Sequence, residues 1–241
     1  MSTTDQRLRP TRRRPFIVDF YSSAIGKKWA MAVSGIALLL YVFAHLIGNL
    51  KLFLGEASLN TYAEFLREMG EPILPFSVLL WILRIGLIVA FVVHIHASYA
   101  LTVINRRARP LDYAGPREYL VANYASRTMR WSGVIVLLFL LYHLADLTWG
   151  WANPDFVRGE VYNNVIASLS RWPVALLYIA ASIALGFHIY HGAWSMFQSM
   201  GINNPRFNRW RRWFAQAFAA FMVVGNVSLP VAVLAGWVPS S

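Results

Sequence analysis

The sequence predicts an all-α protein, an integral membrane bundle of five transmembrane helices. Three observations indicate this fold class: 57% of the 241 residues are hydrophobic, only 14% are charged, and five segments are both long and nearly free of charge. A helix needs about 20 apolar residues to cross a bilayer. The expected spans are residues 29–50, 76–104, 131–149, 172–200 and 213–237.

Before the first span, residues 1–28 are polar and carry seven Lys and Arg residues. A signal peptide would have a shorter apolar core and a small-residue cleavage site. The apolar run here begins late and is longer, so we expect it to be retained as a helix. The organisation predicted is a basic cytoplasmic arm, residues 1–28, followed by a single transmembrane domain, residues 29–241.

After the first span, the sequence SLNTYAEFLRE predicts a short helix lying at the membrane surface. Ser58 or Asn60 is the expected N-cap, and Glu64 stands at the capping-box distance from Thr61. Glu68 follows one turn later. The acidic side chains of such a helix most often form a solvated face.

The arrangement of basic residues predicts the topology. Segments 1–28, 105–130 and 201–212 hold 17 of the 22 Lys and Arg residues, whereas connections 51–75 and 150–171 hold four. Because basic loops stay in the cytoplasm, we expect the N-terminus to be cytoplasmic and the C-terminus to lie outside. The basic residues lie between apolar segments and form no stripe, which argues against a nucleic-acid partner.

Histidines are the unusual feature of the spans. A single histidine inside a helix bundle is most simply a hydrogen-bonded core residue. Polar residues in spans are costly, however, and four of the five spans carry a histidine. The positions are His45, His94, His96, His143, His188 and His191. Two residues are about 200° apart around a helix, so His94 and His96 cannot face the same neighbour.

Arg84 and Asp146 are charged residues within the second and third spans. Arg84 lies about three turns into its span, too deep for its side chain to reach the membrane surface easily. We expect Arg84 to pair with Asp146 or with an anionic group of a cofactor.

Depth sorts the histidines into two groups. At 1.5 Å per residue from the basic ends, His45 and His143 lie in the outer half, while His96, His188 and His191 lie nearer the cytoplasm. Two neutral imidazoles facing each other from neighbouring helices are what a six-coordinate haem iron needs. On depth alone, either His188 or His191 fits the inner pair.

Other chemistry finds little support in the sequence. The chain has no cysteine, which excludes disulfides and cysteine-ligated zinc or iron–sulfur centres within it. Zinc prefers three or four ligands at one point, whereas these histidines are dispersed. No HExxH, phosphate-loop or nucleophile motif is present, so hydrolysis is not expected. A transporter or assembly protein with polar contacts in its bundle is the haem-free alternative.

Four segments carry a resemblance to a known family: LYVFAHLIGNL, VHIHASYALTVINRR, LFLLYHLADL and GFHIYHGAWSMFQSMGINNP. They resemble the membrane-anchor cytochrome b subunit of the succinate dehydrogenase/fumarate reductase (succinate:quinone oxidoreductase, complex II) family. The form they resemble is the single-chain, five-helix, two-haem anchor of bacteria. The resemblance covers nearly the whole chain beyond the basic arm.

The resemblance implies which residues bind two haem b groups. His45 and His143 match the iron ligands of the outer, distal haem. His96, within HAxY, and His188, within FHxxxG, match those of the proximal haem. His191 is then expected near a haem propionate or a quinone, and His94 is left as a supporting or core residue.

The resemblance also implies a place in the respiratory chain and the tricarboxylic acid cycle. Such an anchor lies in the bacterial plasma membrane and passes electrons between a docked iron–sulfur subunit, which carries the flavoprotein subunit, and membrane quinone, here expected to be menaquinone. The dehydrogenation site would lie on another chain. Glu64 or Glu68 matches the acidic residue of the family's quinone site. The haem-bearing alternative is a subunit of another quinone-linked dehydrogenase or a hydrogenase.

Overall fold

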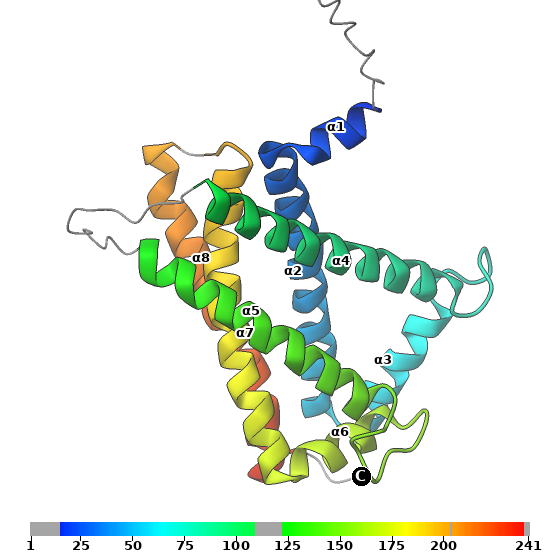
Figure 1. The fold of residues 1–241 in the computed structure, drawn as a ribbon. Coiled ribbons are helices and arrows are strands. Elements are labelled where there is room, and N and C mark those ends of the chain that lie inside the picture. Colours follow the sequence, from blue (N-terminus) through cyan, green and yellow to red (C-terminus); the bar gives the residue numbers. More distant parts are fainter. Residues whose placement is uncertain (1–14, 109–121, 203, 239–241) are drawn as a thin grey trace, which may run out of the picture.

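The computed structural model describes residues 15–108, 122–202 and 204–238, which form eight α-helices and one short 3-10 helix (Figure 1). Within these ranges five helices are long and apolar enough to cross a membrane. The predicted all-helical fold with five long apolar helices is confirmed, and the chain is a multi-pass membrane protein.

The helix boundaries differ from the expected spans where basic residues flank the apolar core. The five long helices are α2 (Ala24–Asn49), α4 (Val78–Arg107), α5 (Ala122–Leu147), α7 (Trp172–Ser199) and α8 (Pro205–Leu234). Helix α8 begins at Pro205, because the Asn204 side chain accepts a hydrogen bond from the Arg206 amide at 2.9 Å. Arginine is a good helix former, so the basic segment continues the helix instead of forming a loop.

Four shorter elements complete the described chain: α1 (Phe16–Ser22), η1 (Leu50–Leu54), α3 (Glu56–Glu68) and α6 (Val161–Ser170). Part of the basic arm is therefore helical. Ser23 separates α1 from α2 in an extended conformation, and its hydroxyl caps α2 by accepting from the Gly26 amide. Such a cap satisfies one of the free amides of a first turn.

The start of α3 corrects the expected N-cap. Gly55, with φ of 89°, is the N-cap, and neither Ser58 nor Asn60 has that role because both lie inside the helix. A positive φ is open to glycine without steric cost, so the chain can turn sharply after η1 and begin the helix three to five residues earlier.

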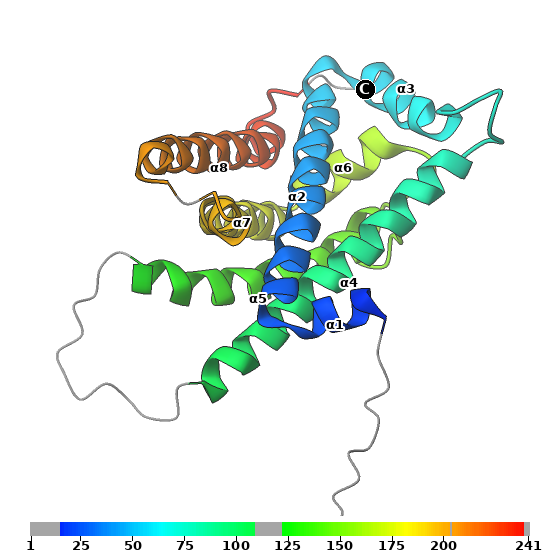
Figure 2. The ribbon, with the colours of Figure 1, turned by 90° about the horizontal axis from the view of Figure 1, so that it is seen from above.

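The long helices contact one another in pairs: α2 with α4, α5 with α7, and α7 with α8. Helix α4 crosses α2 obliquely, and α5 crosses α7 obliquely (Figure 1). Seen from above, α7 and α8 run side by side while α4 and α5 extend away from them (Figure 2). Helices α3 and α6 contact each other at the end where the C-terminus lies (Figure 1).

Small residues allow close helix contacts in this bundle. A Cβ atom at Gly225 of α8 would meet Leu46 of α2 at 2.6 Å. Leu46 is fully buried and packs with Ile189, Ala219 and Met222 of α7 and α8. A second buried cluster joins η1, α3, α6 and α8. The two clusters fix α2 and α8 against α7, while α4 and α5 are more exposed.

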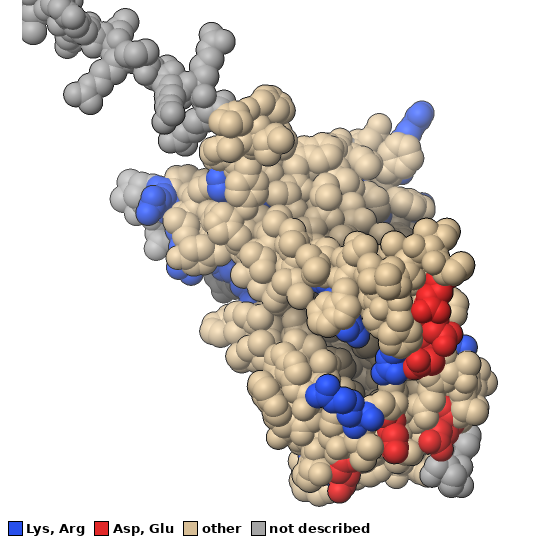
Figure 3. All heavy atoms as spheres, turned by 90° about the vertical axis from the view of Figure 1, so that its right-hand side faces the viewer, with Lys and Arg blue, Asp and Glu red and all other residues tan. Residues whose placement is uncertain are grey.

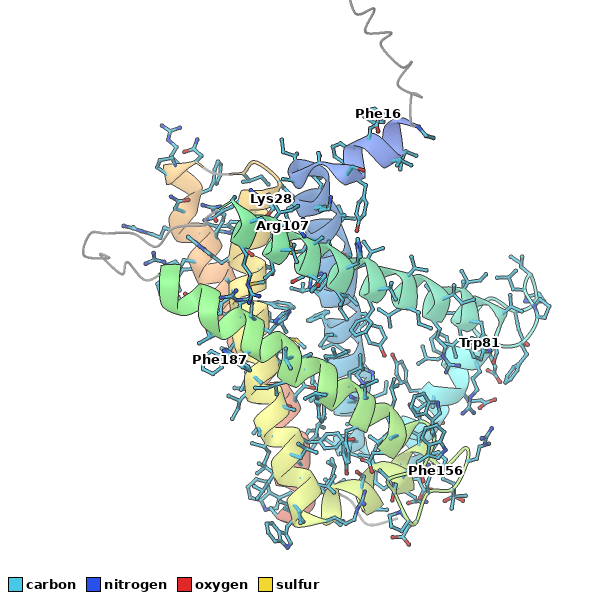
Figure 4. The ribbon with its side chains drawn as sticks, viewed as in Figure 1. Phe16, Lys28, Trp81, Arg107, Phe156 and Phe187 are labelled. Carbon is cyan, nitrogen blue, oxygen red and sulfur yellow. The ribbon has the colours of Figure 1, made fainter. Side chains whose placement is uncertain are left out.

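Charged side chains sort to opposite ends of the described molecule. The starts of α2 and α8 and the end of α4 carry basic residues, and Figure 4 labels two of them, Lys28 and Arg107, at its upper end. Acidic side chains gather in the lower half of the face seen in Figure 3. Arg109 and Arg117 lie outside the described residues.

Candidate functional site

Two pairs of histidine rings lie between the long helices. His45 of α2 and His143 of α5 have ring centres 5.9 Å apart. His94 of α4 and His188 of α7 have ring centres 6.3 Å apart. The first pair lies one helical turn before the ends of α2 and α5, and the second lies near the middle of α4 and α7. The described structure thus contains two histidine pairs at two levels.

Both separations fit two ligands of one metal ion. An imidazole nitrogen binds a first-row transition metal at about 2 Å, so two rings on opposite sides of one ion have centres roughly 6 Å apart. Within the described residues no group of three or more His, Cys, Asp or Glu side chains converges on one point. The donor sets therefore fit two bis-histidine centres, as in haem b, better than a zinc site.

Glycines provide room for the rings of the second pair. A Cβ atom at Gly35 of α2 would lie 3.3 Å from the His94 ring, and one at Gly133 of α5 would lie 3.3 Å from the His188 ring. The edge of each ring that carries Cε1 and Nδ1 therefore lies close to the backbone of a neighbouring helix. Such contacts are tighter than ordinary side-chain packing, so a larger residue at either position would require the histidine ring to shift.

Backbone groups beside these glycines face the same two rings. The Nδ1 atom of His94 lies 3.2 Å from the Met31 carbonyl oxygen, which can accept its hydrogen bond. The Met129 backbone also lies close to the His188 ring. However, the buried Nδ1 of His188 makes no hydrogen bond of comparable geometry within the described chain. The Nδ1 atoms of the two rings thus differ in their hydrogen bonds.

The remaining two histidines lie elsewhere. His96 is exposed, and its Nδ1 atom shares a hydrogen bond with the Tyr21 hydroxyl of α1 at 2.5 Å. The Nε2 atom of His191 is 3.0 Å from the Thr128 hydroxyl of α5. His96 was expected opposite His188, but α4 is rotated so that His94 faces α7. The rotation of about 200° between the two positions turns His96 toward α1.

A polar network extends from His143 toward α6. The Nδ1 atom of His143 lies 3.3 Å from the Tyr178 hydroxyl, and that hydroxyl donates to Asp146 at 2.8 Å. Arg171 donates to the other oxygen of Asp146 at 2.7 Å, and the Ser168 hydroxyl also donates to this carboxylate. Asp146 is fully buried, so these donors satisfy a charge that would otherwise be very costly.

The expected pairing of Arg84 with Asp146 is wrong. The ion-pair partner of Asp146 is Arg171, because the start of α7 lies closer to the end of α5 than α4 does. Arg84 is exposed, with its guanidinium 5.0 Å from the ring centre of Trp81. Trp81 lies near the start of α4, on the right in Figure 4.

The two acidic candidates lie on α3. Glu64 forms an ion pair with Arg67 at 2.7 Å, so it does not act as the capping-box partner of Thr61. Glu68 is exposed at the end of the helix. Figure 3 shows the face with the acidic side chains, which is hollowed beside basic side chains. Both glutamates are at the same end of the molecule as the His45–His143 pair.

An internal repeat relates the two halves of this site. Residues 31–45 read MAVSGIALLLYVFAH, and residues 129–143 read MRWSGVIVLLFLLYH. Each contains the pattern Met-x-x-Ser-Gly followed by histidine ten residues later. The dipeptide His-Ile then recurs in α4 and in α7. Each of the two ring pairs therefore joins equivalent positions of two similar units, α2–α3–α4 and α5–α6–α7.

The contact between His94 and His188 was not expected from the sequence, and the repeat is the signal that points to it. The repeat aligns the His-Ile pair at His94 with the His-Ile pair at His188. Each histidine also packs on the glycine of its own unit. His96 has no such counterpart, because Tyr190 occupies the equivalent position in α7.

Comparison with known proteins gives one match. The family described as "Succinate dehydrogenase/Fumarate reductase transmembrane subunit" matches residues 117–227, just under half of the chain. No curated protein and no solved structure matches. The matched segment contains His143, His188 and His191. Over residues 117–227 the sequence is therefore similar to that of succinate dehydrogenase/fumarate reductase transmembrane subunits.

Proposed function

We propose that the chain is the membrane anchor and di-haem b electron conduit of a succinate:quinone oxidoreductase. In this role electrons pass between a docked iron–sulfur subunit, which carries the flavoprotein subunit, and quinone in the membrane. The observation that carries the proposal is the presence of two histidine pairs, each with the separation of two ligands of one metal. The family match supports the choice of complex.

The proposed ligands are His45 and His143 for one haem and His94 and His188 for the other. Haem b, when bound, supplies a one-electron carrier at each level. The chain holds neutral imidazoles at fixed separation, and Gly35 supports the inner pair by admitting the His94 ring. An apolar bundle interior suits the macrocycle and keeps water from the rings.

The basic end of the molecule is the proposed docking face for the soluble subunits. By the positive-inside rule this end faces the cytoplasm, where Arg106, Arg107 and Arg206 are exposed. Soluble partners with acidic surfaces would be attracted to it, and anionic lipid headgroups would be attracted by the same charges. The opposite end, with α3 and α6, would then face outside.

The proposed quinone site lies at this outer end, near the His45–His143 pair. Glu64 and Glu68 are the proposed proton carriers, because quinone chemistry couples each electron to a proton and a carboxylate at the membrane edge can exchange one. Arg84 is proposed to attract an anionic group of haem or quinone. Electrons would then cross the membrane, each charge costing about 2.3 kcal/mol per 100 mV of potential. The quinone expected is menaquinone.

The test is the haem b content per polypeptide of the purified complex, measured by pyridine haemochrome assay with reduced-minus-oxidised spectra. We expect two haems in the unmodified protein and one in each of the His45→Ala and His94→Ala variants. His96→Ala is the matched control and is expected to retain both, because His96 faces α1.

Two results would contradict parts of this proposal. Loss of a haem from His96→Ala with retention in His94→Ala would make His96 the ligand, as the resemblance implies. Absence of haem from the unmodified complex, isolated from haem-replete cells, would return all six histidines to structural roles.

A further inference from the structure

The buried network around Asp146 fixes where its protons lie. A carboxylate can only accept hydrogen bonds, so Ser168, Arg171 and Tyr178 must all donate to Asp146. Arg171 also donates to the Ala152 carbonyl at 2.7 Å, which holds its guanidinium in place. The Tyr178 hydroxyl has one proton, and it donates that proton in its hydrogen bond to the Asp146 carboxylate.

This proton order determines the tautomer of His143. Because the Tyr178 proton points to Asp146, the phenolic oxygen can only accept from the His143 ring, whose Nδ1 atom lies 3.3 Å away. A neutral imidazole that donates from Nδ1 has its lone pair on Nε2. The ring is therefore held with Nε2 as its only possible metal-binding nitrogen.

The equivalent histidine in the first unit lacks this arrangement. The repeat aligns Asp146 with Gly48 and Tyr178 with Arg84, so His45 has neither a carboxylate nor a phenol at the matching positions. A Cβ atom at Gly48 would instead meet the Tyr62 ring at 2.6 Å. The two rings of the outer pair are thus symmetric in position but unequal in their hydrogen bonds.

We infer that Tyr178 is a positioning residue for the outer centre, which fixes the His143 tautomer and increases the electron donation of that ring. This inference rests on the proposed function, since it concerns a haem iron bound between His45 and His143. A hydrogen bond that ends on a buried carboxylate increases the basicity of an imidazole ligand. Greater basicity stabilises the oxidised metal, so the network lowers the midpoint potential of the outer centre.

The test is an equilibrium redox titration of the haem-loaded complex, with the outer component assigned as the one lost in His45→Ala. Tyr178→Phe removes the hydroxyl and is expected to shift the outer midpoint potential to a more positive value. The inner potential should stay unchanged. Tyr142→Phe is the matched control, because its ring lies 6.4 Å from that of Tyr178 but its hydroxyl makes no hydrogen bond to Asp146 or Tyr178 in the described structure. It should shift neither potential.

For a second variant we expect the outer midpoint potential to shift in the opposite direction. Ser168→Ala removes one donor from Asp146, so the carboxylate accepts more strongly from Tyr178 and the phenol accepts more strongly from His143. The outer potential should move to a more negative value. If Tyr178→Phe does not retain haem, this variant decides the question, and an unchanged outer potential overturns the inference.

The remaining outcomes separate the inference from the function on which it rests. Two haems with unchanged potentials in Tyr178→Phe would overturn the positioning role and leave the electron conduit intact. An equal shift of the outer potential in Tyr142→Phe would mean that the effect comes from general packing, and it would likewise overturn the positioning role of Tyr178. Absence of haem from the unmodified complex would overturn both.

Discussion

Two glycines determine how closely the inner histidine rings approach their neighbouring helices. Gly35 and Gly133 occupy the same position in the repeated pattern, and a Cβ atom at either would lie 3.3 Å from a histidine ring. Glycine is common in transmembrane helices, so composition alone does not distinguish these two from the others. Their contact with His94 and His188 does.

Replacing Gly133 should therefore disturb one centre selectively. In Gly133→Val the branched side chain would displace the His188 ring, and we expect loss of the inner haem with retention of the outer one. The measurement is haem content and the reduced-minus-oxidised spectrum. Gly86→Val is the control, because a Cβ atom at Gly86 meets nothing within 4 Å. Equal losses in both variants would mean that valine simply destabilises the bundle.

The individual site residues could be predicted from the sequence only in part. Spacing and charge indicated that the histidines lie in the spans, and His45 was expected opposite His143, where their rings are found. The choice between His94 and His96 depends on the rotation of α4 about its axis. That rotation is set by packing against α2, and the sequence of one span alone does not predict it. The repeat does indicate it, because it aligns His94 with His188.

At the scale of elements, the spans were predictable because apolar length is a direct requirement of the bilayer. The ends of the helices were less predictable. Hydropathy detects the membrane-embedded part of a helix, so it missed the first turns of α8, whose basic residues continue the helix beyond the apolar core. The short helix α6 was also missed, because its sequence lies in a connection with several polar and turn-forming residues.

Helix α3 presents the two candidate quinone-site acids at the same end as the outer histidine pair. Changing both Glu64 and Glu68 to Gln should lower quinone-linked turnover by about 10²-fold or more, the contribution expected of a positioned proton carrier. Haem content should remain unchanged. The measurement is succinate:quinone reductase activity of the assembled complex.

Glu71→Gln is the control for this pair, because Glu71 is exposed in the same connection but lies beyond the end of α3. It should retain full turnover. Full turnover in the double variant would exclude both glutamates from the quinone site.

At the scale of the whole molecule, the distribution of charged residues predicts how the bundle is oriented across the membrane. The described basic segments meet at one end, and most described acidic side chains lie at the other. Loops rich in Lys and Arg are retained on the cytoplasmic side. The order of five spans then puts the start of α2 and the end of α8 on opposite sides of the membrane.

The absence of cysteine from the sequence makes this orientation easy to test. Single cysteines introduced as Lys28→Cys and Trp151→Cys can be labelled with a membrane-impermeant maleimide in vesicles of defined orientation. Lys28 precedes the first apolar core, whereas Trp151 is exposed at the opposite end. We expect labelling at position 151 in right-side-out vesicles and at position 28 only in inverted ones. The reverse pattern would contradict the proposed topology.

The pairing of equivalent histidines from two repeated units has a consequence for biogenesis. Each ring pair takes one member from α2 or α4 and the other from α5 or α7. During synthesis, the first unit would enter the membrane with half of each ligand set and no complete centre. The outer pair would be complete only after α5 emerged from the ribosome, and the inner pair only after α7 emerged. Once bound, each haem would link the first unit, α2–α3–α4, to the second unit, α5–α6–α7.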